Sequence, residues 1–119
     1  MDEAELRRTK EFALRVVRLC GSLPDAAAGR SPASQLVRSG ISVGADYRVA
    51  CKARSRAEFA SKLGIVEEEA DESAFWLEWV IDARLMRTER VADLLAETNP
   101  ITRTMTSSRL SVRKGRSSQ

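Results

Sequence analysis

The chain has 119 residues, of which 43% are hydrophobic and 31% are charged, and its formal net charge is +3 at pH 7. This length suits one domain with a buried core, and the balance of apolar and charged residues excludes a disordered chain. No apolar run approaches the roughly 20 residues that span a bilayer, so we expect no membrane partner. The N-terminal residues MDEAELRRTKEF are charged where a signal peptide is apolar. We therefore expect a cytoplasmic protein in which Cys20 and Cys51 are reduced thiols that pack as small apolar groups.

Charge separates sharply along the sequence. Residues 30–62 hold seven basic and two acidic residues, a net charge of +5, whereas residues 63–82 hold seven acids and no base. Residues 106–119 add four bases and no acid. In a helical protein this pattern predicts a basic cluster near one interhelical connection and an acidic row along the following helix.

Two helices are predicted in the first half of the chain. Apolar residues recur at helical spacing over about residues 4–23 and again over about residues 32–53. Ser31 followed by Pro32 resembles an N-cap with proline at the first helical position. The second helix contains Gly40 and Gly44, each of which costs about 1 kcal/mol relative to alanine. Either small side chains let a neighbouring helix come close, or the helix is interrupted near residues 39–44.

Two further helices are predicted in the second half. Ser55 and Glu58 have the spacing of a capping box, and the helix that follows runs without proline to about Arg87. A fourth helix begins near residue 90, and Pro100 is expected to kink or end it, although Ile101 and Met105 continue its apolar stripe.

These elements predict an all-α fold, an antiparallel up-down four-helix bundle, because the connections are short and no strand-like alternation occurs. The bundle is expected to cover residues 1–105, and residues 106–119 are expected to form a basic, flexible tail.

The third helix has two apolar faces when its residues are placed at about 100° per position. The predicted core stripe comprises Phe59, Leu63, Val66, Ala70, Ala74, Leu77 and Ile81. The opposite face carries Ile65, Phe75, Trp76 and Trp79. We predict that this second face is a subunit interface, because exposed apolar patches of that size are uncommon in monomers. The alternative is that the ends of the first and fourth helices cover these side chains.

An interface on this face requires cationic partners, because Glu68, Glu69 and Glu72 share it. The Arg and Lys residues of a second copy can supply them, which favours a head-to-tail ring over a two-fold pair.

Most catalytic chemistry is absent from the sequence. The chain has no histidine, which removes the usual general base, the usual catalytic triad and most transition-metal sites. The acidic run at 67–72 lacks the Glu-x-x-His motifs of carboxylate-bridged metal bundles, and no glycine-rich phosphate loop occurs. We expect no enzymatic activity, no metal and no cofactor.

A basic cluster surrounds the connection between the second and third helices. It comprises Arg48, Lys52, Arg54, Arg56 and Lys62. Such a cluster can neutralise phosphates of RNA or DNA, and Tyr47 offers a stacking surface. The alternative is that these cations pair with Asp46, Glu58 and the acidic row of the same or a neighbouring chain.

Several segments resemble one known family. They are RRTKEFA (7–13), SLP (22–24), QLVRSGISVGADYR (35–48), ACKARSRAEFASKLGI (50–65), EEADES (68–73) and WLE (76–78). In one register over about residues 5–95, they are similar to the family named for proteins encoded in intervening sequences of bacterial 23S ribosomal RNA. The resemblance implies a four-helix bundle that assembles into a homopentamer. It also implies kinship with the accessory variability proteins of retroelements, which are pentamers with basic surfaces that bind nucleic acid and a reverse transcriptase.

The chain departs from that family pattern at three places. Asp46 stands where asparagine is usual, Val49 stands where glutamate is usual, and Pro100 lies inside the fourth helix.

The expected function is a non-enzymatic, homo-oligomeric bundle that binds RNA or DNA through its basic cluster. The rival is a protein-interaction scaffold whose charges only hold subunits together.

Overall fold

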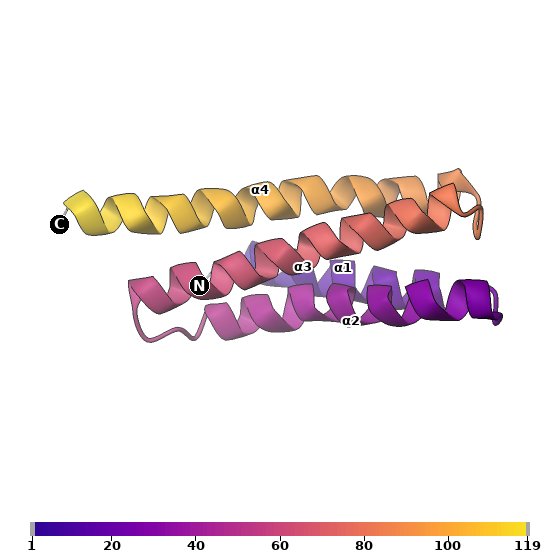
Figure 1. The fold of residues 1–119 in the computed structure, drawn as a ribbon. Coiled ribbons are helices and arrows are strands. Elements are labelled where there is room, and N and C mark those ends of the chain that lie inside the picture. Colours follow the sequence, from indigo (N-terminus) through magenta and orange to yellow (C-terminus); the bar gives the residue numbers. More distant parts are fainter. Residues whose placement is uncertain (1, 119) are drawn as a thin grey trace.

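The computed structural model describes the backbone of residues 2–118 and the side chains of residues 2–112. It consists of four helices, α1 (Glu3–Cys20), α2 (Ala27–Ala50), α3 (Arg56–Asp82) and α4 (Thr88–Ser118). Successive helices run in opposite directions, so that the α1–α2 and α3–α4 connections share one end and the α2–α3 connection lies at the other (Figure 1). Each helix packs on the next in the chain, and α1 meets α4 less extensively. The predicted up-down four-helix bundle is confirmed.

The core is a single cluster to which all four helices contribute. Leu63, Val66, Ala70 and Leu77 of α3 are fully buried, as predicted. Phe59, Ala74 and Ile81, at the margins of the predicted stripe, are half-buried. Among the described residues, no helix combines the length and the hydropathy that crossing a bilayer requires.

Small residues on α2 allow α1 to pack closely against it, and the helix is continuous from Ala27 to Ala50. A Cβ atom added at Gly40 would lie 2.6 Å from Cγ1 of Val16, and one added at Gly44 would lie 3.2 Å from the carbonyl oxygen of Thr9. The cost of glycine in a helix is therefore offset by close interhelical packing. The alternative prediction, a helix interrupted near residues 39–44, is wrong.

The glycine contacts predict opposite effects for two alanine substitutions. Gly40→Ala is expected to lower the free energy of unfolding by about 1–3 kcal/mol, because Val16 is buried and its branched side chain has no alternative position. Gly64→Ala is the matched control, since its Cβ would meet no atom within 4 Å, and it is expected to raise stability by up to about 1 kcal/mol. Denaturant titration measures both. A stabilising Gly40→Ala would contradict the close approach.

Helix α2 begins five residues before its predicted start. Its N-cap is Ala26, which has extended backbone angles and makes no side-chain cap hydrogen bond. Ser31 is therefore not the N-cap, and Pro32 lies inside the helix. No typical N-cap residue marks this start in the sequence. Gly29 is buried where a Cβ would lie 2.3 Å from the carbonyl oxygen of Pro24, so only glycine fits the turn.

Helix α3 ends at Asp82, five residues before its predicted end. Arg84 adopts a left-handed conformation with φ of 56°. Its N–H donates to the Ile81 carbonyl, and the N–H of Leu85 donates to the Val80 carbonyl. This is a Schellman motif, which satisfies the last carbonyl groups of the helix. Because an arginine occupies the position where glycine is usual, no sequence signal marked this end.

Pro100 does not end α4, which continues to Ser118. Proline in a helix interior removes one backbone hydrogen bond and costs about 3 kcal/mol. Ile101 and Met105, directly after Pro100, are fully buried in the core. Their burial offsets the cost, so the predicted break is wrong.

The start of the predicted tail belongs to α4. Arg109 contacts Glu67 of α3 with its Nη2 and the carboxylate Oε2 atoms 3.2 Å apart. The bundle therefore extends beyond residue 105, at least to residue 112. Of the predicted tail cations, Arg113, Lys114 and Arg116 have side chains outside the described residues.

Candidate nucleic-acid interface and oligomer face

The connection between α2 and α3 is fixed by hydrogen bonds that place its cations. Ser55 Oγ accepts the Glu58 backbone N–H at 3.0 Å, as the predicted capping box requires. The Glu58 carboxylate in turn accepts the backbone N–H of Arg54 at 3.1 Å. Glu58 thereby stabilises the helix start. Arg54 and Arg56 flank this cap and extend into solvent.

The five candidate cations make no ion pair within 4.0 Å in the described part of the chain. The acidic row of α3 is instead paired with other arginines. Arg38 of α2 contacts Glu69 at 3.3 Å and also pairs with Glu72, while Arg109 pairs with Glu67. Burial raises the pKa of Glu69 more than the neighbouring Arg38 lowers it. The alternative, in which acids of the same chain neutralise the basic cluster, is therefore not observed among the described residues.

The structure divides the candidate cations between two sides of the bundle. Arg48 and Lys52 line a groove of about 660 Å³ between α1 and α2, together with Arg7 and Lys10. The sequence pattern does not group Arg7 and Lys10 with these cations, because some 40 residues separate them and only the α1–α2 packing brings them close. Lys62 is half-buried on α3.

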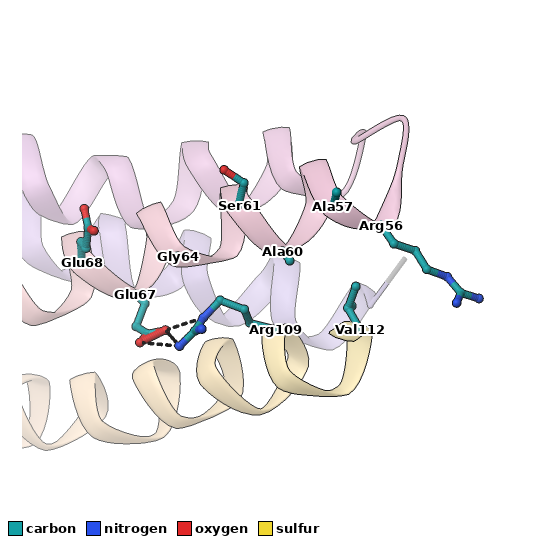
Figure 2. Close-up of a pocket in the computed structure, with 9 residues that line it drawn as sticks. All are labelled: Arg56, Ala57, Ala60, Ser61, Gly64, Glu67, Glu68, Arg109 and Val112. Carbon is teal, nitrogen blue, oxygen red and sulfur yellow. Dashed lines mark hydrogen bonds and ion pairs between the residues drawn. The ribbon is translucent and has the colours of Figure 1, made fainter. Parts of the chain in front are cut away.

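Arg56 lies at a second open groove of about 530 Å³, between the first turns of α3 and the last described turns of α4. Ala57, Ala60 and Gly64 form its small-residue wall. Figure 2 shows Arg56 extending away from the bundle, whereas Arg109 turns inward to Glu67. Of these two arginines, only Arg56 is available to a ligand in solution.

The predicted interface residues on α3 do not share one environment. Ile65, Phe75 and Trp79 are 40%, 51% and 48% exposed, and the ring centroids of Phe75 and Trp79 are 6.1 Å apart. Neither end of the described α1 or α4 covers them. Trp76 is half-buried against the core, and its indole N–H donates to Glu72 at 3.2 Å. Trp76 therefore lies at the edge of the exposed face, nearer to α2 than expected.

Comparisons with known proteins identify the family. The family described as 23S rRNA-intervening sequence protein matches residues 4–107. The chain belongs to this family. A crystal structure of a protein with unknown function from the S23 ribosomal protein family of Bacteroides thetaiotaomicron VPI-5482 is similar, with 31% sequence identity and a TM-score of 0.76, covering 87% of this chain and 95% of that chain. A search of curated proteins found no match.

Two departures of this 23S rRNA-intervening sequence protein from the expected pattern lie on the surface. Val49 is 49% exposed near the end of α2. Asp46 is half-buried and makes no ion pair among the described residues. Neither position changes the packing of the core.

Burial shifts the pKa of several titratable side chains of this family member. Burial raises the pKa of the Cys20 thiol to about 11, so that it is protonated at neutral pH. Burial also raises the pKa of Tyr47. Glu5 is buried beside Arg8 with one carboxylate oxygen unpaired, and desolvation raises its pKa. Within the described residues, no group of three or more His, Cys, Asp or Glu side chains is close enough to hold a metal.

Proposed function

We propose that the protein is a non-enzymatic homo-oligomer, a pentamer as the family resemblance implies, that binds RNA or DNA. The proposed contacts are Arg48, Lys52, Arg54, Arg56 and Lys62. One observation carries the proposal: these five cations have no carboxylate partner within 4.0 Å in the described chain, while Glu67, Glu69 and Glu72 are paired elsewhere. Single-stranded RNA is the first ligand to test.

Assembly into an oligomer raises the affinity for a nucleic-acid strand that each subunit alone would bind weakly. A single subunit offers only a few phosphate contacts, and an oligomer repeats the same cluster on every subunit. Later contacts to the same strand are then intramolecular, which raises the overall affinity without a new type of contact. Because the contacts are to phosphates, binding is expected to be largely independent of sequence.

Charge reversal tests the proposed surface. Changing Arg54, Arg56 and Lys62 together to glutamate is expected to reduce RNA affinity at least tenfold at fixed salt, because each lost cation removes a counterion-releasing phosphate contact. The matched control changes Arg30, Arg84 and Arg87 to glutamate. These exposed residues lie at the opposite end of the bundle, and the control alters the net charge equally. Equal losses in both variants, measured by fluorescence anisotropy, would contradict a localised surface.

A protein-interaction scaffold is the second candidate. The exposed Phe75 and Trp79 side chains favour it, since aromatic residues are enriched in protein interfaces. A scaffold of this kind would leave the basic cluster without a nucleic-acid ligand at any salt concentration.

A further inference from the structure

The exposed face of α3 forms one continuous ridge. Ile65, Glu68, Glu72, Phe75 and Trp79 follow one another at spacings of three and four residues, which places them on one side of the helix. The ridge changes character along the chain, because its acids come before its aromatic residues. We call these five residues the α3 ridge.

The α1/α2 groove and its extension carry the complementary groups. On α1, Arg7, Lys10, Leu14 and Val17 also follow at spacings of three and four residues. Leu14 and Val17 are 41% and 42% exposed. This surface carries Arg7 and Lys10, together with the acid Glu3, near the start of α1 and is apolar further along. The α3 ridge has its acids before its aromatic residues in the same direction.

The second wall of the groove comes from α2. Ile41, Ala45 and Arg48 share one side of that helix at spacings of four and three residues, and Lys52 follows in the turn after the helix end. Ile41 is 46% exposed, and Arg48 and Lys52 line the groove with Lys10. Because α2 runs antiparallel to α1, its apolar residue Ile41 lies toward the apolar part of α1 and its cations lie toward Arg7 and Lys10.

Matching residues of the α3 ridge and of the α1/α2 groove also lie at similar positions along the bundle axis. Gly40 contacts Val16 of α1, and the neighbouring Ser39 shares a hydrogen bond of 2.9 Å with Ser73 of α3. Val16 and Ser73 are therefore at about the same level. Since α1 and α3 run in the same direction, Glu68 is level with Lys10 and Phe75 is level with Val17, each within about one helical turn.

We propose that the α3 ridge of one subunit docks into the α1/α2 groove of a second copy lying parallel to it. Glu68 then faces Lys10, and Phe75 and Trp79 cover Leu14, Val17 and Ile41. Arg48 and Lys52 line the same groove, so that in the assembled oligomer Arg54, Arg56 and Lys62 remain for phosphate contacts. This assignment rests on the proposed homo-oligomer and specifies its interface. Because the surfaces differ, each subunit uses both, and the contact is heterologous, as a closed ring requires.

A two-fold pair of α3 ridges does not fit as well. In an antiparallel pair, the middle of one ridge would meet the middle of the other and bring the two Glu72 carboxylates together. Like charges in such a contact oppose association. The proposed contact instead brings acids to bases and apolar side chains to apolar side chains.

Complementation between two inactive variants tests the inference. The ridge variant is Phe75→Glu with Trp79→Glu, and the groove variant is Leu14→Glu with Ile41→Glu. All four residues are exposed in the subunit, so both variants are expected to fold, which circular dichroism checks. Each variant alone is expected to be a monomer of 13.2 kDa. Their mixture is expected to form a one-to-one heterodimer, because the groove of the ridge variant and the ridge of the groove variant are both intact.

A charge exchange provides an independent readout. Glu68→Lys and Lys10→Glu are each expected to weaken assembly at least fivefold, and the double variant is expected to restore it. A ridge or groove variant that still self-associates, or a mixture that stays monomeric although the unmodified protein is oligomeric, would overturn this interface and leave the proposed oligomer standing. A monomeric unmodified protein would overturn both.

Discussion

Leu63→Ala and Leu77→Ala are each expected to lower the free energy of unfolding by about 2–5 kcal/mol, the usual cost of truncating a buried leucine. Both side chains are fully buried in the core cluster. Truncation removes favourable burial and leaves a cavity, because neighbouring helices relax only in part. Denaturant unfolding followed by circular dichroism measures the loss.

The matched control is Glu78→Ala on the same helix. Glu78 is exposed, and alanine has a slightly better helix propensity. A change within about 0.5 kcal/mol is expected, as for surface substitutions generally. Similar small losses at all three positions would mean that the core face of α3 has been placed wrongly.

Trp79→Glu is expected to dissociate the oligomer while the helix content is retained. Loss of a tryptophan that anchors an interface costs about 2 kcal/mol or more, which weakens each contact roughly 30-fold. The introduced carboxylate adds to the acidic charge of the α3 ridge. Light scattering at micromolar concentration measures the mass, and circular dichroism measures the helix content.

Leu110→Glu is the control for that substitution. Leu110 is 46% exposed on α4, outside both the α3 ridge and the α1/α2 groove. Its replacement is expected to leave the mass unchanged. Dissociation by both substitutions to the same extent would indicate a general loss of solubility or folding, and retention of the oligomer by Trp79→Glu would contradict the ridge interface.

The helices and the core could be predicted from the sequence because their signals are local and periodic. The spacing of Leu63, Val66, Ala70 and Leu77 identified the buried face of α3 before any tertiary contact was known. The errors occurred at helix ends without a sequence signal. Ala26 is not a typical N-cap and Arg84 is not a typical residue for a left-handed turn. The proline signal failed at Pro100 because tertiary burial outweighed a local preference.

The candidate site was predicted less completely, because it depends on contacts between helices. Sequence proximity grouped five cations, whereas the packing of α1 on α2 joins two of them to Arg7 and Lys10. Trp76 was assigned to the outer face from its angle alone. Its hydrogen bond to Glu72 is a local contact within α3, but its packing against the core depends on the neighbouring helices.

The most direct test of the proposed function is the affinity of the unmodified oligomer for single-stranded RNA across a salt series. Phosphate contacts through all five cations of one subunit predict that affinity falls on the order of 50-fold between about 50 mM and about 150 mM salt. Contacts through Arg54, Arg56 and Lys62 alone, with Arg48 and Lys52 inside the subunit interface, predict about tenfold. Binding at low salt that weakens in this range supports the nucleic-acid function. An oligomer that binds neither RNA nor DNA at low salt would contradict it and favour the protein scaffold.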